Sequence, residues 1–115
     1  MRVLVCGGRN YANRAKVWLT LDVQHAVDPI TTIIQGGASG ADLLGEKWAV
    51  SHGIPCITFK ADWNSYGRAA GPIRNKDMLE KGNPNVVVAF PGGKGTADMV
   101  SQARQANIRI IQVKP

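Results

Sequence analysis

A chain of 115 residues is long enough for one domain with a hydrophobic core and too short for two. Its 44% hydrophobic and 19% charged residues exclude a disordered tail, and no apolar run reaches the roughly 18 residues that a membrane span needs. The net charge of +6 favours anionic partners, but the cations are scattered, which disfavours a polybasic arm that binds nucleic acid.

Hydrophobic periodicity predicts strands that alternate with helices along the whole chain. Short apolar or β-branched runs predict the strands, and apolar residues spaced three or four apart predict the helices. In chain order the expected elements are a strand at 2–6, a helix at 14–27, a strand at 31–35, a helix at 40–51, a strand at 56–59, a helix at 72–81, a strand at 86–90, a helix at 96–106 and a strand at 108–113. Residues 60–71 are expected to form one long irregular loop.

This alternation predicts a parallel sheet covered by helices on both faces. Because crossover connections are right-handed, few topologies remain. We expect a Rossmann-like three-layer α/β sandwich of five parallel strands in the order 3-2-1-4-5, with residues 1–115 forming a single domain.

The N-terminus and the cysteines indicate a cytoplasmic protein. The first apolar run is short and ends in glycines, which is typical of a buried strand and not of a signal peptide. Cys6 and Cys56 lie in apolar segments without the spacing of a zinc site, so we interpret both as buried, reduced cysteines.

Three of the five expected strands run directly into glycine-rich loops. The first loop contains Gly7, Gly8, Arg9 and Tyr11, the second Gly36, Gly37, Ser39 and Gly40, and the third Pro91, Gly92, Gly93, Lys94, Gly95 and Thr96. In a parallel sheet all three lie at the carboxyl edge, beside the topological switch point between the first and fourth strands. Glycines and helix N-termini suit a phosphate there. The absence of GxxxxGK[ST] and GxGxxG disfavours a phosphate-loop NTPase and a standard NAD site.

Three cations are candidates for binding the anion. Arg74 is expected in the first turn of its helix, where a cation opposes the helix dipole, so a phosphate or carboxylate ligand would explain it. Arg9 and Lys94 lie inside glycine loops and are either ligands of the same anion or ordinary surface charges.

Two acidic residues each allow a structural and a functional interpretation. Asp42 follows Ser39 at the spacing of a capping box, so it either caps its helix, binds a ribose hydroxyl or acts as a general base. Asp98 is expected in the first turn of its helix, where an acid complements the dipole in any case. Thr96 is expected to cap the same helix, with its hydroxyl also available to a phosphate.

Aromatic residues allow a similar choice. Trp63 lies in the long loop, where its ring either stacks on a base or pins the loop to the body of the protein, and Tyr11 is a second candidate for the base. Trp18 and Trp48 occur at helical spacing and are expected in the core. His25 and His52 have no nucleophile or acid beside them in sequence and are not assigned to catalysis.

The segment Pro91-Gly92-Gly93-Lys94-Gly95-Thr96 resembles the PGGxGT signature of the SLOG superfamily, which includes the LOG phosphoribohydrolases and the DprA-type DNA-binding proteins. The segment from Gly36 to Asp42 resembles the GG-x-x-GA-D element of its YspA-like branch, and the segment from Ala70 to Asn75 also matches that branch. The resemblance implies a Rossmann-like fold and a nucleotide or nucleotide-derived ligand at the switch point, with Asn75 among the site residues.

The sequence departs from the LOG enzymes at one position. Their motif has an arginine in RxxxM, matched by Arg74 and Met78, and then PGGxGTxxE, whose glutamate is replaced here by Met99. Methionine cannot stabilise the positive ribose that develops during hydrolysis. Asp98 or Asp42 would have to take over that role.

Three functions therefore remain. The first is the binding, as a sensor or carrier, of a nucleotide or nucleotide-derived ligand. The second is hydrolysis of the N-glycosidic bond of a nucleoside monophosphate, with Arg74, Asp98 and Asp42 as catalytic residues. The third is binding of single-stranded nucleic acid. Mg²⁺ is expected only as a companion of a phosphate, since no acidic cluster forms a metal site. A homodimer is a further expectation, and no membrane partner is expected.

Overall fold

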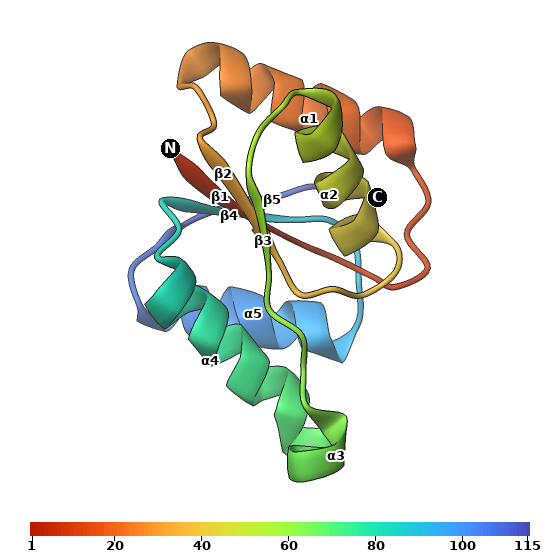
Figure 1. Ribbon diagram of the computed structural model, residues 1–115, viewed down its shortest axis with the longest axis vertical. Helices are drawn as coiled ribbons and strands as arrows, with labels where there is room; N and C mark the ends of the chain where they lie inside the picture. Colours follow the sequence, from red (N-terminus) through yellow and green to blue (C-terminus); the bar gives the residue numbers. More distant parts are fainter.

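Five parallel strands form one sheet in the order β3-β2-β1-β4-β5 in the computed structural model, which describes residues 1–115 (Figure 1). The strands are β1 (Arg2–Cys6), β2 (Thr32–Gln35), β3 (Cys56–Thr58), β4 (Val86–Ala89) and β5 (Arg109–Gln112). The helices are α1 (Arg14–Val27), α2 (Ala41–Ser51), α3 (Trp63–Tyr66), α4 (Ala70–Gly82) and α5 (Lys94–Gln105), with a 3-10 turn, η1 (Gly67–Ala69), before α4. The predicted fold class and strand order are confirmed.

The sheet lies between two helical layers, with α1 and α2 on one face and α4 and α5 on the other (Figure 1). Successive residues of a strand point to opposite faces. Val3 and Val5 of β1 accordingly pack into one core cluster, which contains the fully buried Trp48 of α2. Leu4 and Cys6 pack into a second cluster with residues of α4 and α5. Because both faces are covered, the central strands are continuous apolar runs.

The prediction of one irregular loop over residues 60–71 is wrong. Residues Trp63–Tyr66 form α3, and Asp62 caps it by accepting a hydrogen bond from the Ser65 amide (3.1 Å). Helix α4 then begins at Ala70, two residues before the predicted start. Pro72 is tolerated as its third residue because the amides of a first helical turn have no partner within the helix.

Helix α5 also begins two residues earlier than predicted, at Lys94, with Gly93 as its N-cap. All the other predicted boundaries agree with the structure to within one residue, which is the usual uncertainty of helix and strand ends. Cys6 is buried as expected, whereas Cys56 is only half-buried, and both are free. None of the helices combines the length and hydropathy needed to cross a bilayer.

Candidate functional site

The three glycine loops meet at the carboxyl edge of the sheet, where Gly8 joins them. The Gly8 amide donates to the Pro91 carbonyl (2.9 Å), and the Gly8 carbonyl accepts from the Ala41 amide (3.2 Å). Gly40 has a left-handed backbone (φ 75°), and a side chain there would collide with the Gly8 carbonyl oxygen. The loops after β1, β2 and β4 therefore form one unit beside the switch point between β1 and β4.

A cleft of about 670 Å³ opens at this unit, within the range of ligand-binding pockets. Most of the site residues predicted from the sequence line it together. They are Gly7, Gly8, Arg9, Tyr11, Asp42, Arg74, Asn75, Pro91, Gly92, Gly93, Lys94, Gly95 and Thr96. Of the other predicted residues, Gly36, Gly37, Ser39 and Trp63 line a neighbouring pocket, and Gly40 and Asp98 line neither.

Arg74 lies between the two pockets and lines both. It is the fifth residue of α4, so the prediction that it lies in the first turn, against the dipole, is wrong because α4 starts earlier. Its Nη1 donates to the Gly36 carbonyl (2.6 Å) and its Nε to Asn75 Oδ1 (3.1 Å). A side chain at Gly36 would collide with this guanidinium. These contacts hold Arg74 against the loop after β2 and leave Nη2 without a protein partner.

Asp42 does not form the predicted capping box. Its Oδ2 accepts hydrogen bonds from the amides of Gly36 (3.1 Å) and Ala38 (3.3 Å), in the loop before α2. Ser39 Oγ instead donates to the Arg9 carbonyl (2.9 Å). The carboxylate of Asp42 therefore points back to the loop before α2. It stabilises the shape of that loop instead of capping the helix.

Asp42 is also the only acidic residue that lines the cleft, and it is 6% exposed. Burial raises its pKa to about 6, against the opposing effects of the Ala38 amide and the Arg74 guanidinium. Burial, together with the Asp42 charge, also raises the pKa of Cys6 to about 12, so its thiol stays neutral. A carboxyl group that titrates near pH 6 in a cleft is suited to accept and release protons.

Asp98 is held away from the cleft. Its Oδ2 accepts hydrogen bonds from Asn75 Nδ2 (2.9 Å) and Gln102 Nε2 (2.8 Å). Because α5 starts at Lys94, Asp98 lies in the second turn and not in the first, as predicted. Met99, at the glutamate position of the LOG motif, is 1% exposed and belongs to the core. Of the carboxylates considered from the sequence, only Asp42 lines the cleft.

The start of α5 presents backbone amides at the cleft. The amides of Gly93, Lys94, Gly95 and Thr96 have no hydrogen-bond partner within the protein. Thr96 is the third residue of α5 and not its cap, which corrects the prediction. A side chain at Gly92 would collide with Thr96, whereas open space surrounds Gly93 and Gly95. Internal packing therefore explains Gly92 alone, and a ligand close to the backbone would explain the other two.

A second pocket of about 620 Å³ adjoins the cleft and shares Arg9, Ala38 and Arg74 with it. Its other walls are the loop after β2 and the segment from Lys60 to Trp63. Lys60 was not predicted from the sequence, although its position two residues after β3, at the same carboxyl edge, was an available signal. The remaining lining residues that were not predicted as site residues are Cys6, Asn10, Ala38, Ala61 and Met78.

Four cations border the two pockets, namely Arg9, Lys60, Arg74 and Lys94. None of them forms a salt bridge. Asp42 is the only acidic residue that lines either pocket, so the site as a whole favours anions. No group of three His, Cys, Asp or Glu side chains is placed to hold a metal ion.

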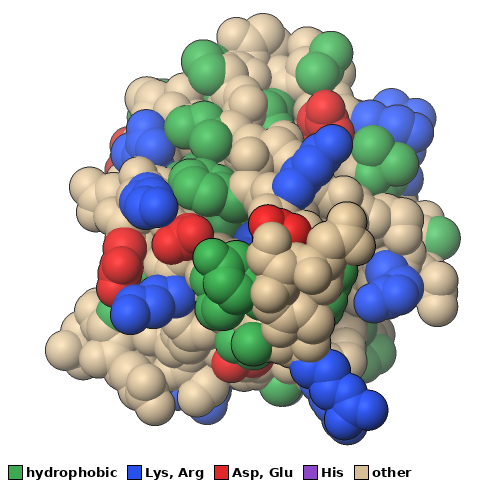
Figure 2. Space-filling model, turned by 60° about the horizontal axis from the view of Figure 1, so that its bottom comes forward, with side chains coloured by type: hydrophobic (Ala, Val, Ile, Leu, Met, Phe, Trp, Pro, Cys, Tyr) green, Lys and Arg blue, Asp and Glu red, His purple; other side chains and the backbone are tan.

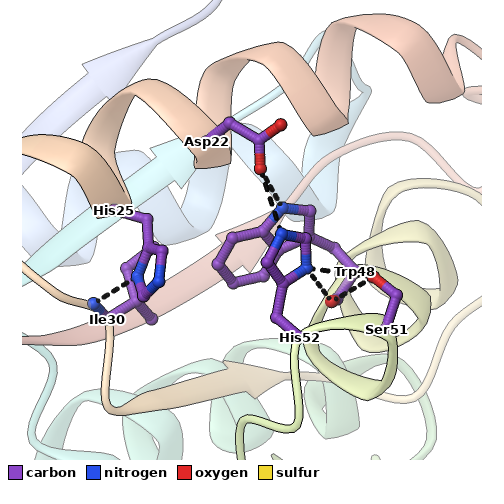
Figure 3. Close-up of polar contacts among 6 residues, drawn as sticks. All are labelled: Asp22, His25, Ile30, Trp48, Ser51 and His52. Carbon is purple, nitrogen blue, oxygen red and sulfur yellow. Dashed lines mark hydrogen bonds and ion pairs between the residues drawn. The ribbon is translucent and has the colours of Figure 1, made fainter.

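A different polar cluster lies between α1 and α2 (Figure 3), and none of its residues lines either pocket. Asp22 Oδ1 accepts a hydrogen bond from Trp48 Nε1 (2.9 Å) and lies 3.3 Å from His52 Nε2. The His52 ring stacks on Trp48, with 4.2 Å between ring centroids. His25 Nδ1 accepts from the Ile30 amide (2.9 Å). These groups join α1 to α2, and the two histidines have structural contacts.

The sheet order and the joined glycine loops define a Rossmann-like α/β protein with a cleft at the switch point. Solved structures with a similar fold include DNA processing protein A (DprA) from Streptococcus pneumoniae, with a TM-score of 0.76 and 16% identity over 99% of this chain and 50% of that chain. Another is glycinamide ribonucleotide transformylase 1 from Symbiobacterium toebii, with a TM-score of 0.57 and 14% identity over 100% of this chain and 51% of that chain. The chain thus spans about half the length of each.

Within this class, the chain belongs to the YspA, cpYpsA-related SLOG family, whose model matches residues 1–66. It is also 34% identical to the Gene 61 protein of Mycobacterium phage D29 over 118 residues, which cover 96% of this chain and 94% of that protein. The resemblance to the SLOG superfamily is confirmed. The family match includes the loops after β1 and β2 but ends before Arg74 and the loop after β4.

Proposed function

We propose that the protein, as a single domain, binds a nucleotide or nucleotide-derived ligand in the cleft at the carboxyl edge of the sheet. The observation that carries this proposal is the meeting, in one cleft, of the unpaired amides at the start of α5 and the unpaired Nη2 of Arg74. Helix N-terminal amides and a guanidinium both donate to phosphate oxygens. A phosphate between them would satisfy donors that the protein leaves free.

The rest of a nucleotide also has suitable partners here. Asp42 is available to accept a hydrogen bond from a ribose hydroxyl. Tyr11 lines the same cleft, and its ring is supported by Phe90 at 5.4 Å between centroids, so it offers a surface for a base. A Mg²⁺ ion would accompany the phosphate and would draw most of its ligands from phosphate and water.

The first test is mass spectrometry of the small molecules released when freshly purified protein is denatured. We expect a nucleotide or nucleotide derivative from the wild type and its loss from Arg74→Ala. Arg68→Ala is the matched control, because Arg68 is exposed on η1 and lines neither pocket. Equal recovery of the nucleotide from Arg74→Ala and the wild type would contradict the proposed site.

Hydrolysis of a nucleotide N-glycosidic bond is the second candidate, and the position of Asp42 favours it. A buried carboxyl group with a pKa near 6 is suited to act as a general base in this cleft. Asp42 would take a proton from water as the oxygen attacks C1′. The base would leave with the electron pair of its bond to C1′ and take up a proton returned by Asp42 or supplied by solvent. The products would be ribose 5-phosphate and the free base.

Chromatography of the protein incubated with each nucleoside monophosphate tests this activity. Release of free base by the wild type, and its loss in Asp42→Asn but not in Asp98→Asn, would establish the hydrolase. Equal turnover by Asp42→Asn and the wild type would exclude this mechanism. Binding without release of base would leave the nucleotide-binding proposal in place.

Single-stranded nucleic acid is the third candidate ligand, and DprA is a DNA processing protein with this fold. Figure 2 shows Lys and Arg side chains in separate groups on one face, with acidic and apolar side chains between them and no continuous basic track. Binding that falls steeply with salt would support this candidate. A homodimer stays a prediction, which the mass of the protein in solution would test.

A further inference from the structure

The two adjoining pockets offer more space than one nucleotide fills. Each has a volume typical of a complete ligand site, about 670 Å³ and about 620 Å³. They meet at Arg9, Ala38 and Arg74, so the same side chains border both. A mononucleotide in the first pocket would leave the second without an occupant.

Each pocket is lined by its own aromatic ring, half-buried in the first pocket and exposed in the second. Tyr11 lines only the first pocket and Trp63 only the second. Trp63 is 55% exposed, and its ring lies next to Gly71 at the start of α4. Aromatic rings that line a cationic groove are typical platforms for nucleic-acid bases. The site therefore has a platform at each end.

The cations that both pockets share lie between these rings. Arg9 and Arg74 border both pockets, and neither has an acidic partner. The start of α5 lines the first pocket beside Arg74. This middle part of the site is where a phosphate linkage would be bound, with an aromatic platform on either side.

We propose that the ligand is a dinucleotide, in which two nucleosides are joined through phosphates held by Arg9 and Arg74, with one base beside Tyr11 and the other beside Trp63. This inference rests on the proposed nucleotide-binding function and specifies its ligand class. The second pocket is then the subsite that distinguishes a dinucleotide from a mononucleotide.

Calorimetric titration with matched probes tests the inference. The probes are the four ribonucleoside diphosphates and the four symmetrical dinucleoside pyrophosphates with the same bases. We expect at least one dinucleotide to bind about tenfold or more tightly than its matched diphosphate, because stacking of one base is worth about that factor. Trp63→Ala should remove this advantage without changing the affinity for the diphosphate. Tyr66→Ala is the control, because Tyr66 is exposed on the same helix and lines neither pocket.

The outcomes separate this inference from the function on which it rests. Equal affinity of matched probes for the wild type, or an equal loss of both in Trp63→Ala, would overturn the dinucleotide and keep the nucleotide site. Equal losses in Trp63→Ala and Tyr66→Ala would overturn the assigned platform. Failure of all eight probes to bind would overturn both proposals.

Discussion

Two polar clusters of this molecule contain similar groups but differ in what they leave unpaired. Between α1 and α2, the Asp22 carboxylate receives the Trp48 indole N–H and faces the His52 ring (Figure 3). At the cleft, Arg74 keeps Nη2 free and the first amides of α5 have no partner. The comparison teaches that unpaired donors, more than polar residues as such, distinguish a ligand site from a structural contact.

The structural cluster even contains the residue types of a catalytic triad. Ser51 Oγ lies 3.0 Å from His52 Nδ1, and His52 Nε2 lies 3.3 Å from Asp22. However, Ser51 Oγ donates to the Trp48 carbonyl (2.8 Å), which also lies 2.8 Å from His52 Nδ1. The carbonyl thus takes the hydroxyl hydrogen that a base would have to remove from a nucleophilic serine. We interpret these contacts as a tie between α1 and α2.

The largest expected effect is a change of stability with pH, which comes from Asp42, the carboxyl group of the cleft. The pKa of Asp42 is about 6 in the folded protein and 3.8 as its ordinary value, so folding favours its protonated form. Stability contributed by this group is therefore present below pH 4 and is lost as the pH rises to 6, by up to about 3 kcal/mol. Asp42→Asn should abolish this decrease of stability with rising pH. Denaturant unfolding of the variant and the wild type across pH 4–7 measures the difference. Parallel pH profiles for the variant and the wild type would contradict it.

The next effect tests the fixed guanidinium of the cleft. Arg74→Lys keeps the charge but loses the planar guanidinium, which donates to the Gly36 carbonyl through Nη1 while presenting Nη2 to a phosphate. We expect nucleotide affinity to fall by about ten- to a hundredfold, as for the loss of a charge-assisted hydrogen bond. Calorimetry measures the change, with Arg68→Lys as control. Unchanged affinity would show that charge alone is sufficient.

A change in the structural cluster should affect stability and not binding. Asp22→Ala leaves the N–H of the buried Trp48 indole without its acceptor, which costs about 1–3 kcal/mol of unfolding free energy. Nucleotide affinity should remain that of the wild type, because Asp22 lines neither pocket. Urea unfolding and calorimetry on the same sample test both parts. Loss of affinity in the folded variant would show that the two clusters are coupled.

The smallest expected change has opposite signs for stability and binding. Gly95→Ala places a methyl group in open space within the first turn of α5, and alanine favours a helix over glycine by up to about 1 kcal/mol. The melting temperature should rise by a few degrees, while nucleotide affinity falls because the methyl group occupies the approach to the amides. A variant that is more stable and binds equally well would argue against a ligand at this turn.

The alternation of strands and helices, and the edge of the sheet at which the glycine loops meet, could be predicted from the sequence. The apolar runs and helical spacings fix the alternation, and right-handed crossovers bring the glycine loops to one edge. Helix α3 was missed because one turn of four residues is too short to carry a periodic signal. The start of α4 was placed at Pro72 because proline is common at the first helical position, whereas Pro72 is here the third residue, and this also displaced Arg74 in its helix.

The polar partners of the site could not be predicted, because they depend on packing between distant elements. Asn75 binds Asp98 only because α4 lies beside α5, and no local pattern encodes that pair. Ser39 and Asp42 have the spacing of a capping box, but the left-handed Gly40 between them redirects both side chains. Lys60 lines the second pocket because it follows β3, which lies beside β2 at the edge of the sheet.

The hydrogen bond from Gly8 to the Pro91 carbonyl has a consequence for when the cleft forms. It joins the beginning of the chain to its last quarter, and contacts between such distant segments are slow to form. The cleft is complete only after β4 has paired with β1. A ligand therefore binds the folded protein and not a partly folded intermediate. Binding should therefore slow the unfolding rate and leave the folding rate unchanged.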